Sequence, residues 1–171
     1  MRFPMPHLKK ILLLPLIALV FALTGCGSSS SVVQPIPKAT AMGEAPVKYF
    51  AGEFSPGDTT IPSHILNAIK GHLDATLQKN ALGAQPDYAN RLRIDGTVTY
   101  YRMRSGFTRM MFGVFAGKDG VECEIRLIDP AGQTVGKLKV ESHNLMAVGS
   151  EDDVARMVAE ETVKAIRADG K

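Results

Sequence analysis

Two cysteines and four histidines are the side chains in this 171-residue chain best suited to nucleophilic, metal-binding or acid–base chemistry. One of them, Cys26, directly follows the small pair Thr24-Gly25, at the end of a charge-free apolar run from Ile11 to Leu23. Three basic residues and no acidic residue precede that run. A basic start, a short apolar core and a small-residue cleavage site are the layout of a secretory signal, so the Cys26 thiol lies where a processing enzyme would act on it.

The run Leu23-Thr24-Gly25-Cys26 resembles the lipobox of bacterial lipoproteins, in which the signal peptidase cleaves between Gly25 and Cys26. In proteins with that box, the cysteine sulfur receives a diacylglycerol and the freed amino group is acylated. The alternative is a transmembrane helix, which needs about 20 apolar residues, whereas the run from Ile11 to Leu23 has 13. We therefore expect residues 1–25 to be a signal peptide. We expect the covalent diacylglycerol and N-acyl chain on Cys26 to anchor the mature chain in a membrane, with no other cofactor.

The residue after the cysteine is Gly27 rather than an aspartate. In enterobacterial lipoproteins an aspartate at this position signals retention at the inner membrane. The resemblance therefore favours an outer-membrane anchor with the domain in the periplasm. Inner-membrane sorting and surface exposure stay open as alternatives.

The mature chain is expected to be formally neutral. The signal removes three of the 20 Lys and Arg residues and none of the 17 Asp and Glu residues. A neutral chain lacks the basic excess that binds nucleic acid, so we expect no nucleic-acid partner. With Cys26 acylated, Cys123 has no partner for an intramolecular disulfide. The alternation from Val121 to Leu127 places Cys123 on the apolar side of a strand, where we expect it to be buried.

Catalytic and metal-binding signatures are missing from the sequence, which has no G-x-S-x-G, phosphate loop, H-E-x-x-H or C-x-x-C. His64 and His72 have no His or Glu partner at the spacing of a helical metal site, so a surface and a core-edge histidine are the simpler interpretations. His143 near Glu141 could act as a base with an orienting carboxylate, but an exposed strand-end histidine is the simpler interpretation. We expect no catalytic residue and no metal. A hydrolase whose residues meet only in three dimensions is the least favoured alternative.

Periodicity divides the mature chain into two parts. Residues 26–46 are rich in Ser, Pro and Ala and predict a flexible tether, and residues 47–171 predict one periplasmic domain. The pattern predicts strands and helices in the order strand, helix, strand, strand, strand, helix, at 47–50, 62–80, 92–101, 121–128, 134–142 and 151–168. The expected fold class is α+β, with one antiparallel-rich sheet of about four strands and both helices packed on one face.

The turn Asp129-Pro130-Ala131-Gly132 predicts an antiparallel hairpin between the fourth and fifth of these elements. Pairing Asp129 with Gly132 places Cys123 opposite Leu138 on the core side. The same register places Glu122 opposite Lys139 on the other face.

One segment of unusual composition lies between two of the predicted strands. Residues 102–118 combine four cations with three Met and three Phe residues. An adaptable, Met- and Phe-rich surface flanked by Arg suits a protein contact or insertion near anionic headgroups. The alternative is a long hairpin connection whose Met and Phe residues cover one end of the core. The candidate contact residues are Arg102, Arg104, Phe107, Arg109, Met110, Met111, Phe112 and Phe115.

Two binding functions fit these features. The first is a non-enzymatic, outer-membrane-anchored module that binds another envelope protein through an exposed sheet edge or through the segment 102–118. The second is a binder of lipid or another amphiphile at the membrane surface, using the same segment and a cavity between the helices and the sheet; its binding to vesicles should weaken with salt.

In the centre of the chain, Arg109 is followed by Gly113-Val114-Phe115-Ala116-Gly117, and the later run Leu127-Ile128-Asp129 is followed by Gly132 in the turn. These runs resemble the proteobacterial lipoproteins grouped as domain of unknown function 4410, which have an arginine, then a glycine-aromatic-alanine-glycine run, then a strand that ends in an aspartate and a glycine turn. The resemblance covers about residues 47–167 and departs at Val114 and at Pro130-Ala131. The resemblance implies a fold and an envelope location, and it brings no activity.

Overall fold

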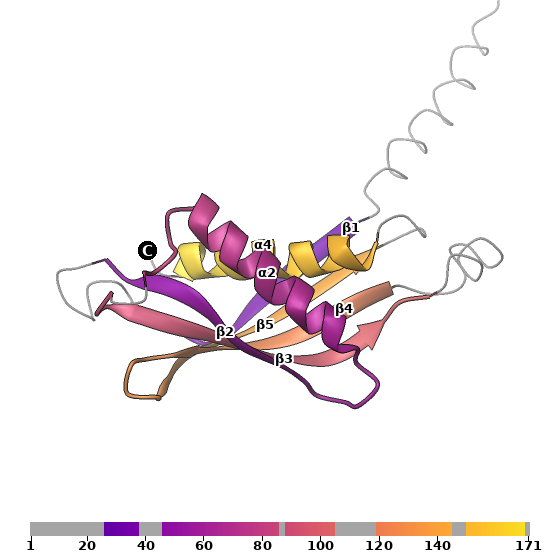
Figure 1. Cartoon of the computed structure of the whole chain (residues 1–171), viewed down its shortest axis with the longest axis horizontal. Helices are drawn as coiled ribbons and strands as arrows, with labels where there is room; N and C mark the ends of the chain where they lie inside the picture. The colour runs from indigo at the N-terminus through magenta and orange to yellow at the C-terminus, as the bar shows by residue number, and fades with distance from the viewer. Residues whose placement is uncertain (1–25, 38–45, 86–87, 105–118, 145–149, 170–171) are drawn as a thin grey trace, which may run out of the picture.

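The computed structural model describes residues 26–37, 46–85, 88–104, 119–144 and 150–169 (Figure 1). They form a five-stranded sheet in the order β1-β5-β4-β3-β2, and two mutually contacting helices cover one face of it. The elements are β1 (Cys26–Gln34), β2 (Lys48–Pro56), α2 (Ser63–Lys79), β3 (Arg91–Arg102), β4 (Asp119–Ile128), β5 (Thr134–Asn144) and α4 (Glu151–Asp169). The predicted α+β class is confirmed. The sheet has five strands rather than four, and it is mixed rather than only antiparallel.

The additional strand is β1, and it corrects the predicted tether. Residues 26–34 join β5 in an antiparallel ladder in which Cys26 lies opposite Asn144 and Ser30 opposite Val140. A run of serines shows no apolar alternation, but an edge strand is held by backbone hydrogen bonds that do not depend on it. The prediction of a flexible tether is therefore wrong for residues 26–34. Residues 38–45 lie outside the described part of the chain.

The parallel pair explains why the sheet is mixed. β2 runs parallel to β3, with Tyr49 opposite Leu92, and α2 supplies the crossover that two parallel neighbours require. β2 also continues to Pro56, beyond the predicted end at Phe50. The register shifts between Ala51 and Phe54, so β2 bends at the point where the sequence suggested that it would stop.

Both helices form where the periodicity predicted them. In α2 the apolar arc that includes Ile65, Ile69 and Leu73 is buried against the sheet. α4 begins with a reciprocal cap, in which the Asp153 amide donates to Ser150 Oγ at 3.1 Å and the Ser150 amide donates to Asp153 Oδ2 at 2.8 Å. This cap satisfies two backbone donors at the start of α4.

The hairpin of β4 and β5 has the predicted faces but not the predicted register. Cys123 lies opposite Val140, and Glu122 lies opposite Glu141. The turn is one residue longer than predicted, so Ile128 pairs with Thr134. A register shift between Leu127 and Ile128 then moves the pairing of the two strands by one more residue. A shift of two residues leaves every side chain on its original face, because side chains alternate with a period of two. Lys139 still reaches Glu122 along the diagonal, with Nζ 3.0 Å from Oε2.

The core lies between the sheet and the two helices. It includes Cys123, which is fully buried as predicted. Burial raises the pKa of the Cys123 thiol to about 12, with the nearby Glu124 carboxylate as a smaller cause. A thiol with so high a pKa is almost entirely protonated at neutral pH, so Cys123 is a packing residue rather than a nucleophile.

Candidate functional site

The start of the Arg-, Met- and Phe-rich segment is held by a buried ion pair. Arg102 is the last residue of β3, and it is exposed opposite Gly120. Arg104 lies deeper, with Nε 2.7 Å from Asp119 Oδ1 and with only 9% and 1% of the two side chains exposed. The Arg104 amide also donates to Asp119 Oδ1 at 3.2 Å. Arg104 therefore positions the chain at this point and does not project from the described surface.

The other residues predicted for this contact are outside the described part of the chain. They are Phe107, Arg109, Met110, Met111, Phe112 and Phe115. The structure does place the positions that flank them. Asp119 lies opposite Asn144, and Asn144 lies opposite Cys26, so all three residues occupy the same end of the sheet. The predicted anchor and the two flanks of the predicted contact segment therefore belong to one end of the domain.

The outer edge of β1 is open. β1 is the last strand of the sheet, and no described residue pairs with its outer side. Its side chains include the exposed apolar residues Val32 and Val33, which are 45% and 66% accessible. It has no charged residue, and charge is a common means by which edge strands avoid pairing with other chains. An edge with these properties is suited to accept a further strand.

α4 holds β1 from the helix-covered side. Ser28 and Ser30 donate their hydroxyl hydrogens to the Glu161 carboxylate, at 3.2 and 2.9 Å. The Glu161 side chain is only 7% exposed, and Lys164 Nζ approaches it at 3.1 Å. After the strand, the Ile36 amide donates to Asp169 Oδ2 at 2.7 Å. The serines are thus fixed by a carboxylate on a neighbouring helix, a contact that the sequence pattern gave no reason to expect.

The opposite edge, β2, differs from β1 because its outward backbone groups are already used. The Tyr49 amide donates to the Leu82 carbonyl at 2.8 Å, and the Tyr49 carbonyl accepts from the Ala84 amide at 2.8 Å. The Ala51 amide donates to the Asp74 carboxylate of α2 at 3.2 Å. β2 also ends in a proline, a feature that discourages strand addition, whereas a register shift occurs in both edge strands, between Ala51 and Phe54 in β2 and between Val32 and Gln34 in β1. Among the described residues, β1 is therefore the more open of the two sheet edges.

Two histidines that the sequence left without partners contact the start of α4. His64 Nε2 lies 2.6 Å from Glu151 Oε2, and His72 Nε2 lies 2.7 Å from Asp152 Oδ1. The Tyr101 hydroxyl donates to Glu151 Oε1 at 2.7 Å. Burial raises the pKa of Tyr101, and the hydrogen bond to Glu151 raises it further. These contacts join α2, α4 and β3, which is a structural role. The residues in each contact are so far apart in the chain that no rule of sequence spacing could have predicted them.

His143 and Glu141, the candidate base and orienting carboxylate, lie on the sheet face that the helices leave uncovered. Both are half-buried. The Glu141 carboxylate is 3.0 Å from Lys139 Nζ, and Glu122 contacts the same amine. These two carboxylates raise the pKa of Lys139. Glu141 is thus part of a charge network on the open face, which gives no support to a catalytic pair.

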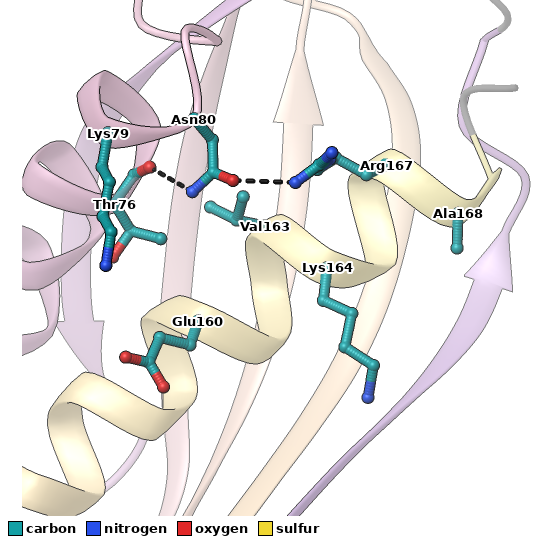
Figure 2. Close-up of a pocket in the computed structure, with 8 residues that line it drawn as sticks. All are labelled: Thr76, Lys79, Asn80, Glu160, Val163, Lys164, Arg167 and Ala168. Carbon is teal, nitrogen blue, oxygen red and sulfur yellow. Dashed lines mark hydrogen bonds between the residues drawn. The ribbon is translucent and has the colours of Figure 1, made fainter.

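A cleft of about 500 Å³ opens between the C-terminal halves of α2 and α4 (Figure 2). Its cations do not converge on one point. Arg167 Nη1 donates to Asn80 Oδ1 at 2.8 Å, while Lys79 on α2 and Lys164 on α4 lie on opposite sides of the view (Figure 2). Lys164 is also paired with Glu161. The cleft therefore lacks the focused charge of a built anion site.

Among the described residues, no group of three or more His, Cys, Asp or Glu side chains is arranged to hold a metal ion. None of the helices that the structure describes is long and apolar enough to cross a bilayer.

These features define a small α+β domain with one open sheet edge and no assembled reaction centre among the described residues. By sequence, the chain belongs to the family named Domain of unknown function (DUF4410), whose model matches residues 53–149. The family resemblance expected from the sequence is confirmed. No curated protein matches the chain.

Two solved structures share the fold of this chain. Both are PelC dodecamers from Paraburkholderia phytofirmans, one of them with the substitution L103M. They have 17% and 16% identity and a TM-score of 0.54, with 80% of this chain and 95% of theirs covered. A PDZ domain protein from Parabacteroides distasonis has 14% identity and a TM-score of 0.40, covering 84% of this chain and 37% of that chain. At these identities the PelC likeness establishes the fold alone.

Proposed function

We propose that this chain is a non-enzymatic envelope lipoprotein that binds another protein by adding a strand of that protein to the outer edge of β1. The observation that carries the proposal is the contrast between the two sheet edges. The outward groups of β2 bond to Leu82, Ala84 and Asp74, whereas β1 is open and exposes Val32 and Val33. An added strand gains main-chain hydrogen bonds along its length and buries these apolar side chains.

The location is part of the proposal and rests on the lipobox that ends at Cys26. Acylation of Cys26 anchors the domain, and Gly27 after it favours the outer membrane with the domain in the periplasm. The lack of catalytic motifs in the sequence supports a binding role rather than an enzymatic one.

A second copy of this chain is the first partner to test. The PelC proteins that share the fold are dodecamers. The low identity does not transfer that assembly to this chain, but it makes self-association the natural first comparison. A different envelope protein is the other outcome of the same experiment.

Photo-crosslinking in intact cells tests the contact directly. A photoreactive amino acid replaces Ser31 or Val33 on β1, and Asn67 on the exposed side of α2 serves as the matched control position. We expect a discrete crosslinked species from the β1 positions and none from Asn67. Mass spectrometry of that species separates a second copy from another protein. The proposal fails if the β1 positions give no discrete species, or if Asn67 gives the same one.

Val33→Lys then tests the edge without a crosslinker. A lysine on an edge strand opposes strand addition, and a substitution at so exposed a position changes stability by no more than about 0.5 kcal/mol. We expect Val33→Lys to abolish the crosslink from Ser31 while the domain stays folded. Asn67→Lys adds the same charge on α2 and should leave the crosslink intact.

A further inference from the structure

The predicted anchor residue has no spacer between it and the folded domain. Cys26 is the first residue of β1 and lies in register with Asn144, which in turn lies opposite Asp119. Neighbouring strands are about 5 Å apart, so the three backbone positions fall within about 10 Å of one another. A flexible tether of 20 residues would instead have separated anchor and domain by about 25 Å.

Several other elements begin or end at the same end of the sheet. β2 runs parallel to β3 and ends there at Pro56. The exposed loop residues Asp58 and Thr60 follow, before α2 begins. The contact of His64 with Glu151 places the start of α2 beside the start of α4. In Figure 1 these element ends gather on the side where β1 begins, and the β4–β5 turn lies at the opposite end.

We propose that this end of the domain lies against the phospholipid bilayer surface, with the sheet strands directed away from it. The inference rests on the proposed acylation of Cys26 and adds an orientation to it. Acyl chains that leave the first residue of a paired strand cannot enter the bilayer unless that strand end is at the headgroups. Arg102, exposed at the same end, is then within reach of lipid phosphates. The turn around Ala131 faces the periplasm.

This orientation limits how a partner can bind. β1 extends outward from the bilayer, so a strand added to its open edge must also run away from the membrane. Nine residues in β1 correspond to about 30 Å of strand. The contact surface of the proposed function is therefore a strip that begins at the headgroups. The cleft between α2 and α4 is lined by residues near the C-terminal ends of both helices (Figure 2), which this orientation places away from the bilayer.

Tryptophan fluorescence measures the orientation, because the chain contains no tryptophan. Thr60→Trp places a single donor at the proposed membrane end, and Ala131→Trp places one at the opposite turn; both positions are exposed. The full chain is expressed with its signal, purified and reconstituted in phospholipid vesicles that contain a dansyl-labelled headgroup lipid. Because β4 rises by about 30 Å between the two ends, we expect several-fold greater energy transfer from Thr60→Trp.

A spacer provides the control. Ten Gly and Ser residues inserted after Cys26 give a linker of about 18 Å and should bring the two transfer values together. Equal transfer from both variants without the spacer, or greater transfer from Ala131→Trp, overturns the orientation. Mass spectrometry of the purified chain decides acylation separately. If Cys26 carries no lipid, the proposed anchor fails. The same variants are then coupled at the Cys26 thiol to a maleimide phospholipid, a reaction that the buried Cys123 does not compete for, so the orientation is still measured.

Discussion

Removing the Asp119 carboxylate should lower the free energy of unfolding of this domain by a large amount. In Asp119→Ala, the Arg104 guanidinium loses a carboxylate partner 2.7 Å away while its side chain stays 91% buried. Breaking a buried ion pair by removing one member costs about 3–5 kcal/mol, because the remaining charge loses the interaction that offset its desolvation. The loss should lie toward the upper part of that range, since Asp119 Oδ1 also accepts the Arg104 amide. A domain of this size is stable by about 5–15 kcal/mol, so the effect is easy to measure.

Two comparisons separate this effect from ordinary surface electrostatics. Arg104→Met combined with Asp119→Leu removes both charges, and it should recover most of the stability that either single change costs. Glu160→Ala breaks the ion pair in which Glu160 Oε1 lies 2.9 Å from Arg156 Nη1. Both side chains are exposed, Glu160 to 52% and Arg156 to 44%. That change should cost no more than about 1 kcal/mol.

Urea unfolding followed by circular dichroism gives the free energy of unfolding for each variant. The reasoning is refuted if Asp119→Ala costs no more than Glu160→Ala. In that case the Arg104 guanidinium is solvated in solution, and Arg104 returns to the set of residues available to a partner.

Three further outcomes are expected. Ser150→Ala should cost about 1 kcal/mol at neutral pH through loss of the α4 cap, as measured by urea unfolding. The amide of Ser150 and, to a smaller extent, its hydroxyl donate to Asp153 and hold the pKa of that carboxyl below its usual value. Of these two bonds, Ser150→Ala removes only the one from the hydroxyl. The contribution of that bond is present above the unfolded-state pKa and lost as pH falls through the folded-state pKa, so the cost should shrink in acid. In a Cys26→Ser chain, Cys123 should resist a thiol reagent such as dithionitrobenzoate until urea unfolds the protein, and rapid labelling of the native state would contradict its burial and its pKa of about 12. Glu161→Ala should accelerate amide hydrogen exchange in β1 and leave exchange in β4 unchanged, because Glu161 accepts hydrogen bonds from Ser28 and Ser30 of β1 and from no residue of β4. If β1 exchanges at the same rate in the variant as in the wild type, backbone pairing alone holds the strand.

The helices and the hairpin faces were predictable because each depends on one repeating pattern. Ile65 and Ile69 recur at helical spacing and pack on a sheet that any α+β arrangement would supply. Cys123 alternates with charged neighbours, so its face was fixed even though its partner was two residues away from the expected one. A register error of two preserves the faces, whereas the length of a turn and a nearby bulge depend on local backbone geometry that alternation does not encode.

The remaining features depend on contacts between distant residues. His64 and Glu151 are 87 positions apart, and no helical spacing rule connects them. The parallel pairing of β2 with β3 follows from the path of α2, which periodicity does not specify. β1 shows the clearest limit, because its serines resemble a linker by composition. They form a strand because β5 offers an unpaired edge and Glu161 accepts two of their hydroxyl hydrogens.

That strand changes the meaning of the lipobox at Cys26. A tethered domain could meet partners anywhere within the reach of its linker, and its open edges would face in no fixed direction. A domain whose first paired residue is the anchor has one end at the bilayer and its open edge at a fixed position beside it. Because Val32 and Val33 are exposed on that strand, they would lie at a fixed distance from the membrane, where a partner anchored in the same membrane could contact them. Serine-rich β1 thus links the two proposals, because both the orientation of the domain at the membrane and the binding of a partner strand are assigned to it.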